Sequence, residues 1–422
     1  MSAVLEAPAE NPAALSPALG APTGFLAGVF LAQIVNGALH LLQPLLIARL
    51  AGGSLADAAL FSAFDTSVHM GGAFLAGWPA DRFGARRLLC AATLLRGASL
   101  ALIPLLWLSG RLTLAAAAAA YTLDALVRGF ADTAAHALPL ELAGRDAAAL
   151  DAVNARYEFV FDLGAALGPA LLAALLLRGP RAASLAAHAL VPAGFVLAAL
   201  AFWTIPRRTR PEPLRPRPSR PGAAPGGPLQ GLGAVLADPV LLAAVAGAAA
   251  LNLYPLRKLL SAFFASAILS RPETAGLVGA AFGIGGALGA LLYARRAGAG
   301  AAGWLAAGGA GALALALGWA PGGLAPMLAA AFLFSLGNVG ARLALTRRAQ
   351  ERTPAGLIGG VTAAARFCAD GASVVVKALV GAAFALGAGP RGAFAAVGAG
   401  LAALALAQFA AAARLSRDGR EQ

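Results

Sequence analysis

Apolar residues form long blocks along the chain, separated by short polar or glycine- and proline-rich connections. Each block holds roughly 20 residues, which is the length an α-helix needs to cross about 30 Å of hydrocarbon. Runs such as Ala243–Leu251 lack the apolar–polar alternation that the strands of a membrane β-barrel require. The pattern predicts an all-α membrane protein with twelve transmembrane helices, at about 24–48, 58–79, 88–108, 113–136, 152–177, 183–205, 239–269, 274–294, 303–319, 324–346, 355–387 and 391–413.

The longest connection divides these spans into two equal sets. Residues 206–238 carry six arginines among many prolines and glycines, a composition too polar and too helix-breaking to cross lipid. Six spans precede this segment and six follow it, which is the outline of a duplicated six-helix bundle. We therefore expect a disordered N-terminal tail over 1–22, a six-helix bundle over 23–205, a cytoplasmic linker over 206–238, a second six-helix bundle over 239–413 and a cytoplasmic tail over 414–422.

Arginine is distributed unevenly between alternate connections. The even-numbered connections and the C-terminus hold 18 arginines, whereas the odd-numbered connections hold 6. Because positive residues remain on the cytoplasmic side, this bias predicts that both termini and the linker are cytoplasmic. Frequent alanine and the preference for arginine over lysine suggest a GC-rich bacterial genome. We therefore expect the inner membrane of a bacterium.

The composition supports a membrane protein and excludes other classes. Hydrophobic residues make up 59% of the chain and charged residues 12%, about half the charged fraction of soluble domains. This excludes a soluble enzyme and a disordered protein, and two cysteines within apolar blocks, Cys90 and Cys368, exclude a secreted disulfide scaffold. The net charge of +13 is spread between blocks, so we expect the basic linker to lie near anionic lipid headgroups, with no nucleic acid as partner.

One connection carries a family signature. The sequence between the second and third spans is Gly-Trp-Pro-Ala-Asp-Arg-Phe-Gly-Ala-Arg-Arg-Leu, from Gly77 to Leu88. It resembles the signature loop of the major facilitator superfamily (MFS), from which Pro79 and Ala85 depart. The resemblance implies that Asp81 meets the positive N-terminal end of the eleventh helix and helps to close the cytoplasmic side. We assign a gating role in this loop to Gly77, Asp81, Arg82, Gly84 and Arg86.

A second element lies in the fifth predicted span. The sequence Gly164-Ala-Ala-Leu-Gly168-Pro169 is similar to the Gly-x-x-x-Gly-Pro element that the family carries mainly in its antiporters. Small residues four positions apart also allow close helix packing without any such function, and this alternative stays open. Other stretches resemble the bacterial branch that contains siderophore and drug exporters, so the resemblance favours export.

We single out six acids and six bases inside the predicted spans. A charge at the centre of a bilayer costs about 2.5–3.5 kcal/mol, so each needs a partner or a water-filled cavity. The acids are Asp65, Asp124, Asp132, Glu158, Asp162 and Asp370, and the bases are Arg128, Arg257, Lys258, Arg342, Arg366 and Lys377.

Helical spacing groups many of these polar residues into stripes. In the family's fold, the first, fourth, seventh and tenth helices line the central cavity. The resemblance therefore places a substrate site at Gln33, Asn36, His40, Asp124, Arg128, Asn252, Tyr254, Arg257, Lys258, Asn338 and Arg342. The second and eleventh helices would meet at a seam, where we expect Asp65 to pair with Lys377 or Arg366 as an outer gate, with Asp370 on the same helical face.

Less specific interpretations of these charges remain open. Asp124, Arg128 and Asp132 could neutralise one another within one helix, and Arg257, Lys258 and Arg342 could extend to the membrane surface. Glu158 and Asp162 lie one turn apart and repel each other when both are charged. We expect proton coupling at Glu158, Asp162 and Asp132, and helix packing at Gly164, Gly168 and Pro169.

These patterns predict a secondary active transporter that works by alternating access. We expect a proton-coupled exporter, an antiporter, of a small anionic or zwitterionic organic compound, because four bases face two acids on the predicted cavity helices. The alternatives are a proton-coupled uptake symporter for a metabolite and a non-transporting membrane sensor or assembly partner. We expect no enzymatic activity, cofactor or metal site, and a monomer whose partners are the solute, protons and the lipid bilayer.

Overall fold

The computed structural model describes residues 23–52, 54–143, 147–176, 180–205, 228–251, 261, 264–271, 274–296, 301–318, 322–353, 357–387 and 390–418. Within these ranges the chain is helical and contains no strand. The first half comprises α1 (Thr23–Leu50), α2 (Leu55–Leu75), α3 (Gly77–Phe83), α4 (Ala85–Leu108), α5 (Leu114–Ala143), α6 (Ala147–Leu176) and α7 (Pro180–Trp203). The second half comprises α8 (Pro228–Ala237), α9 (Pro239–Leu251), η2 (Phe264–Ile268), α11 (Ala275–Arg295), α12 (Ala301–Gly318), α13 (Leu324–Arg352), α14 (Ile358–Ala385) and α15 (Pro390–Asp418).

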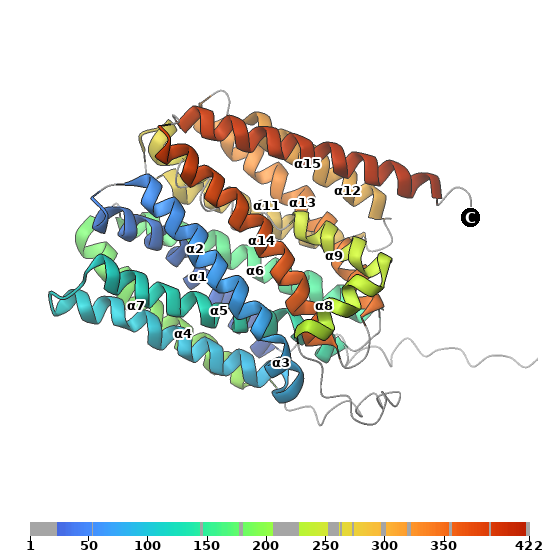
Figure 1. The fold of residues 1–422 in the computed structure, drawn as a ribbon, viewed down its shortest axis with the longest axis horizontal. Coiled ribbons are helices and arrows are strands. Elements are labelled where there is room, and N and C mark those ends of the chain that lie inside the picture. Colours follow the sequence, from blue (N-terminus) through green and yellow to red (C-terminus); the bar gives the residue numbers. More distant parts are fainter. Residues whose placement is uncertain are drawn as a thin grey trace, which may run out of the picture.

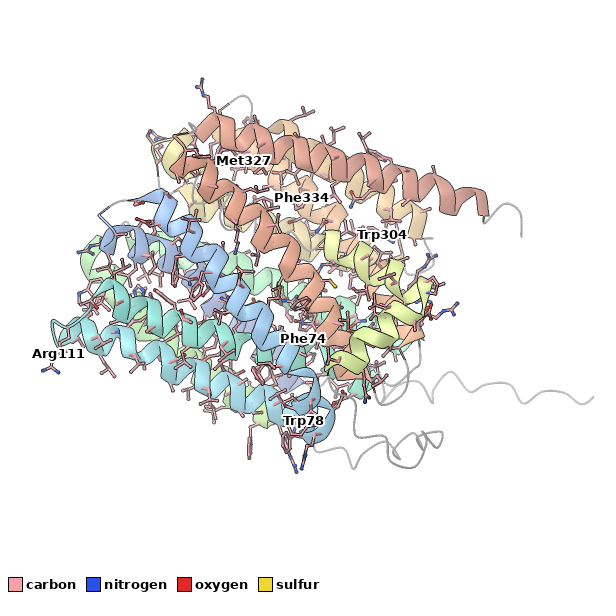
Figure 2. The ribbon with its side chains drawn as sticks, viewed as in Figure 1. Phe74, Trp78, Arg111, Trp304, Met327 and Phe334 are labelled. Carbon is pink, nitrogen blue, oxygen red and sulfur yellow. The ribbon has the colours of Figure 1, made fainter. Side chains whose placement is uncertain are left out.

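The helices form two bundles that meet along a long seam (Figure 1). The helices α1 to α7 lie together on one side, and α9 and α11 to α15 lie on the other. The helix α2 lies along α14, and α6 lies along α11, so two pairs of helices make the main contacts between the halves. Each half has its own apolar core; Met327 and Phe334 mark that of the second half in Figure 2.

Nine of the described helices are long and apolar enough to span a membrane, or ten if the bent pair α8–α9 counts as one span. Of the four helices at the seam, α11 and α14 meet this criterion and α2 and α6 do not. Both carry ionisable residues in their middle turns, including Asp65 in α2 and Glu158 and Asp162 in α6. These acids face protein rather than lipid, since all three are buried.

Local sequence explains where several elements begin and end. The Ser54 hydroxyl caps α2 by accepting a hydrogen bond from the Asp57 amide, at 3.1 Å. Between α3 and α4, Gly84 has φ +85°, a conformation that residues with a Cβ rarely adopt. This accounts for the glycine at that position of the signature loop.

Part of the predicted linker is structured. Residues Pro228–Ala237 form the apolar helix α8, which packs on α14 where Gly231 meets Gly360. The carboxylate of Asp238 then accepts hydrogen bonds from the first amides of α9, and the chain bends by 111° between the two helices. This part of the predicted linker is therefore an apolar helix that buries side chains against α14. Residues 206–227 lie outside the described part.

The Gly164–Pro169 element lies between two helices. A Cβ on Gly164 would lie 2.7 Å from the carbonyl oxygen of Phe30, and a Cβ on Gly168 would overlap the carbonyl oxygen of Ile34, both in α1. On the other side, Pro169 faces Gly279 of α11. The small residues thus let α6 approach its neighbours in both halves.

Replacing Gly168 with alanine should destabilise the protein by about 1–3 kcal/mol, because the added methyl group meets backbone that cannot move aside. The melting temperature of the purified full chain in detergent measures this. Gly71→Ala in α2 is the matched control, since its added methyl group would enter open space. Equal melting temperatures for the two variants would contradict this account of the packing.

Candidate functional site

A polar cavity lies between the halves. It is lined by α1, α2, α5, α6, α9, α13 and α14 and has about 1160 Å³ of space, including its part open to solvent. The ionisable side chains on its wall are Asp65, Asp132, Asp370, Arg128, Arg342, Arg366, Lys377, His40, His69 and His136.

Predicted substrate-site residues from three helices reach this cavity: Gln33, Asn36, His40, Arg128, Asn338 and Arg342. The amide of Asn338 donates to the carbonyl oxygen of Leu251, at 2.9 Å. Four other predicted residues, Asn252, Tyr254, Arg257 and Lys258, lie outside the described residues.

Asp124 is paired with an arginine that is not among the predicted site residues. Arg96 of α4 donates to both oxygens of Asp124, at 2.8 and 3.3 Å, and to the side-chain oxygen of Asn36, at 2.7 Å. Its guanidinium also lies 4.2 Å from the ring centroid of Phe195. Arg96 lies in the middle of the predicted span 88–108, and this position was the signal that could have identified it.

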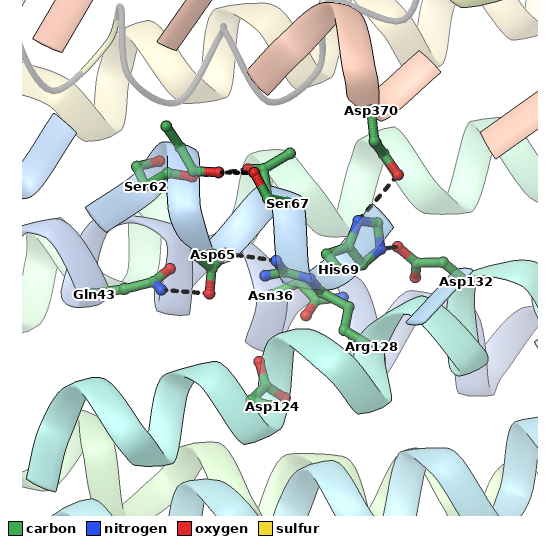
Figure 3. A network of polar contacts seen from close by, with 12 residues as sticks. Asn36, Gln43, Ser62, Asp65, Ser67, His69, Asp124, Arg128, Asp132 and Asp370 are labelled. Carbon is green, nitrogen blue, oxygen red and sulfur yellow. Dashed lines mark hydrogen bonds and ion pairs between the residues drawn. The ribbon is translucent and has the colours of Figure 1, made fainter. Parts of the chain in front are cut away.

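Asp65 also has a different partner from the one expected. Its oxygens accept hydrogen bonds from Arg128 of α5, at 2.7 Å, and from Gln43 of α1, at 2.9 Å (Figure 3). Lys377 instead donates to the hydroxyl of Thr66, at 2.6 Å. The predicted pairing of Asp65 with Lys377 or Arg366 is therefore wrong, because α5 packs beside α2 within the same half and supplies a nearer cation. Arg128 therefore makes its close ion pair with Asp65 of α2 and not with an acid of its own helix.

A buried histidine joins the two halves. The Nε2 atom of His69 lies 3.1 Å from Asp132 Oδ2 of α5, and its Nδ1 atom lies 3.0 Å from Asp370 Oδ2 of α14. Figure 3 shows the imidazole between these two carboxylates. Arg366 lies 3.4 Å from Asp132 Oδ2, so a second contact crosses the seam at the same level. We call His69, Asp132 and Asp370 the histidine bridge.

A second inter-half ion pair lies nearby. Arg342 of α13 donates two hydrogen bonds to Glu158 of α6, at 3.0 and 2.5 Å. Arg342 therefore does not extend to the membrane surface, and Glu158 is neutralised by the opposite half. Asp162, one turn further along α6, is fully buried against Gly286 of α11.

These contacts lie between two cavities. A second cavity of about 850 Å³, open space included, is lined by α5, α6, α9, α13 and α14. Three side chains line both cavities, namely His136, Arg342 and Arg366. These three side chains thus lie at the boundary between the two cavities.

The halves also meet at the end of the bundle where the signature loop lies. Asp81 accepts hydrogen bonds from the amides of Gly359, at 2.9 Å, and Gly360, at 3.2 Å, in the first turn of α14. At the same end, Arg347 pairs with Asp151 at 2.8 Å. The family resemblance implies this contact of Asp81 with the eleventh predicted span, 355–387, which corresponds to α14.

Other loop residues stabilise the same end. Arg86 donates to the carbonyl oxygens of Trp203 and Ile205, at 3.2 and 2.5 Å, which ties α4 to the end of α7. The guanidinium of Arg82 lies 5.0 Å from the ring centroid of Trp78. A Cβ on Gly77 would lie 3.1 Å from Ala363 of α14, so this glycine allows the loop to approach the second half.

Among the described residues, no group of three or more histidine, cysteine, aspartate or glutamate side chains could hold a metal ion. Cys90 is buried and Cys368 is exposed, and both are free thiols.

Removing Arg96 alone should be costly. Arg96→Met leaves Asp124 buried without its cation, which should destabilise the protein by about 3–5 kcal/mol. The double variant Arg96→Met with Asp124→Leu should recover most of this loss, since neither charge remains. Melting temperatures of the two single variants and the double variant measure the coupling. Additive losses would contradict a direct pair.

The pH dependence of stability should include a contribution from Asp81. Burial raises the pKa of Asp81 to about 6, and the hydrogen bonds from Gly359 and Gly360 act in the opposite direction. A raised pKa means that the folded state holds this proton more tightly than the unfolded state. The contribution of Asp81 to stability is therefore largest at pH about 4 and is lost as the pH rises through about 6.

In Asp81→Asn, the decline of melting temperature between these pH values should accordingly be smaller than in the wild type. The control Asp57→Asn changes an exposed carboxylate at the start of α2 and should keep the wild-type slope. A wild-type slope in Asp81→Asn would show that this carboxylate does not titrate as described.

Comparisons with known proteins agree with this architecture. The chain is similar in structure to the human organic anion transporter MFSD10 (TETRAN), with a TM-score of 0.67 and 17% identity, over 92% of this chain and 98% of that one. It is also similar to a bacterial homologue of the iron transporter ferroportin in the outward-facing state with soaked iron, with a TM-score of 0.65 and 15% identity, over 93% and 98% of the two chains. No curated protein matches the sequence.

Such low identities establish the fold alone. The sequence itself matches the Major Facilitator Superfamily over residues 25–376, which is most of the chain. The match covers both halves of the structure, including the signature loop, the seam helices and the histidine bridge. The protein therefore belongs to the Major Facilitator Superfamily and has the fold of its multi-pass membrane transporters.

Proposed function

We propose that the protein is a proton-coupled secondary transporter that exports a small anionic or zwitterionic organic compound by alternating access. The observation that carries this proposal is the histidine bridge, in which one titratable ring links a carboxylate of each half. The arginine bias between connections supports placing the Asp81 end and both termini on the cytoplasmic side. We propose a monomer in the inner membrane of a bacterium.

The chemistry of imidazole explains how this bridge couples to protons. The charged ring has two N–H donors and can bond both Asp132 and Asp370, whereas the neutral ring has one donor and one acceptor. Loss of the proton therefore leaves one carboxylate facing a lone pair, which weakens the link between the halves. Protonation favours the conformer in which the bridge is formed.

Charged groups from each neighbouring element act on His69. Asp132 and Arg128 face it from α5, Asp370 and Arg366 face it from α14, and Asp65 lies one turn away on its own helix. The two carboxylates in contact favour the charged ring, and the arginines oppose it. Movement of α14 away from α5 would remove one of these carboxylates, so proton release and the separation of the halves would occur together.

This arrangement changes the expected distribution of coupling residues. Asp132 keeps its proposed role, because it contacts both His69 and Arg366. His69 and Asp370 join it as coupling residues. Glu158 also keeps its proposed coupling role, because its ion pair with Arg342 is a second contact between the halves. Asp162 keeps a proposed coupling role beside Glu158, because both carboxylates interact electrostatically with Arg342.

The lining of the cavity supports an anionic or zwitterionic solute. Four cationic side chains and three carboxylates contribute to its wall. The structural similarity to a human organic anion transporter is consistent with this class. The similarity to a homologue of an iron transporter does not extend to a metal site among the described residues.

A second candidate is uptake by cotransport of the solute with a proton. The observation that favours it is the location of His69 in the wall of the same cavity as the cations. A bound anion would attract a proton to His69, and by linkage the proton would strengthen anion binding. Exchange instead requires that the solute and the proton favour opposite conformers.

Proteoliposomes that contain a pH-sensitive dye distinguish these modes. Each member of a panel of small carboxylates and amino acids is placed on one side, and proton movement is recorded. Exchange predicts that protons move against the direction of the solute, and cotransport predicts the same direction. A non-transporting role predicts no proton movement and no rise in melting temperature with any solute.

His69→Gln should reduce solute-driven proton movement to the level of protein-free liposomes, because glutamine cannot carry the proton between the two carboxylates. The matched control is His188→Gln. His188 is also buried, its Nε2 atom lies 3.0 Å from the hydroxyl of Tyr121, and it does not line the cavity. Wild-type proton movement in His69→Gln would exclude the bridge as the coupling site.

A further inference from the structure

Lys377 differs from the other cations of the cavity. Its side chain lines the wall and is 5% exposed, so it is buried in the seam between α14 and α2. Its one hydrogen bond among the described residues goes to the hydroxyl oxygen of Thr66, at 2.6 Å. Within the same part of the chain, no carboxylate lies within 4 Å of its ammonium nitrogen.

The three arginines of the wall each have a carboxylate partner. Arg128 pairs with Asp65, Arg342 with Glu158, and Arg366 with Asp132. Asp65 lies close enough to influence Lys377, but its two oxygens already accept from Arg128 and Gln43. Asp370, the other carboxylate near Lys377, contacts His69. Both carboxylates near Lys377 thus lie closer to another cationic or titratable side chain, Asp65 to Arg128 and Asp370 to His69.

Thr66 leaves most of the donor capacity of the ammonium group unused. Its hydroxyl donates to the carbonyl oxygen of Ser62, at 2.9 Å, and accepts from Lys377. An ammonium group has three N–H donors, so two have no acceptor among the described residues. A charged group inside a membrane persists where it has a partner or faces a water-filled cavity. Lys377 faces the cavity, so water or a solute there can accept its remaining hydrogen bonds.

We propose that Lys377 binds the negative group of the transported solute, and that this group is a single carboxylate. The inference rests on the proposed function and names the chemistry of its site. Each arginine of the wall has a carboxylate partner and Lys377 has none within 4 Å among the described residues, so its single positive charge suits one negative charge. A compact ammonium on a flexible stem can turn from Thr66 to a carboxylate oxygen without breaking another ion pair.

The choice of lysine is consistent with this role. The chain has two lysines, and arginine occupies the other basic positions. An arginine would present a rigid fork of donors suited to a fixed carboxylate partner, as at Glu158. A lysine suits a partner that arrives and leaves.

Thermal shift measurements on the purified full chain test this assignment. The probes are benzoate, phenylacetate and hexanoate, each compared with its neutral amide over a concentration series. The acids should raise the melting temperature of the wild type and the amides should not. Lys377→Met keeps the volume of the side chain and removes its charge, and it should weaken the apparent affinity for the acids about 10- to 100-fold.

Two further variants make the test specific. Lys377→Arg keeps the charge and should retain binding of the acids. Ser373→Ala, one turn away on α14 and outside the cavity wall, should behave as the wild type. Equal stabilisation of Lys377→Met and the wild type by the acids would overturn the proposal. So would stabilisation of the wild type by none of the three acids.

The outcome is separable from that of the proposed function. Binding of acids that requires Lys377, without proton movement in liposomes, would support the carboxylate site and refute proton-coupled transport. Proton movement that is lost in His69→Gln but unchanged in Lys377→Met would leave the transporter in place and refute the carboxylate site.

Discussion

The cost of placing charge inside a membrane determines how this protein is built. Twelve ionisable groups are expected in the spans, and those that the structure describes lie in the interior of the protein. Some pairs, such as Arg96 with Asp124 and Arg128 with Asp65, lie within the first half and hold its helices together. Others cross between the halves, as in the histidine bridge and the pair of Arg342 with Glu158. The first kind fixes each bundle, and the second kind can break when the bundles move.

Contacts that depend on close packing and contacts that depend on charge lie in different parts of the protein. The backbone contacts of Gly168 and the contacts of Asp81 with α14 depend on close approach and on hydrogen bonds to amides. The inter-half contacts near the middle of the seam depend on charge instead. A proton or an anion can therefore change the central contacts directly, while the packing within each half persists. Alternating access needs this combination of rigid bundles and a charge-sensitive interface.

Much of the fold could be predicted from the sequence. The length of an apolar block indicates a membrane-spanning helix, and the signature loop indicates a turn and a contact with a helix end. The glycine at position 84 and the contact of Asp81 with α14 follow from this loop. The helix α8 could not be predicted in this way, because its apolar face is short and lies within a segment rich in arginine and proline.

The partners of the buried charges were harder to predict than their positions. Spacing shows which residues share a helical face, but it does not show which neighbouring helix that face meets. The prediction for Asp65 therefore named α14, although α5 supplies Arg128. The partners of His69 are 63 and 301 residues away along the chain, so no local pattern could reveal the bridge. Arg96 could have been predicted by the same reasoning as Arg128, because it also lies in the middle of an apolar span.

We propose that protonation of His69 holds the halves together at the histidine bridge. Spin labels at Ser109 of the first half and Leu386 of the second, both exposed, report the distance between the halves at the end opposite Asp81. Cys90 and Cys368 are replaced by alanine so that only the introduced cysteines are labelled. If this proposal is correct, acidification shifts the distance distribution of the wild type towards one conformer, and the shift is clearly smaller in His69→Gln. A wild-type distribution that is independent of pH, or an equal response in His69→Gln, would contradict it.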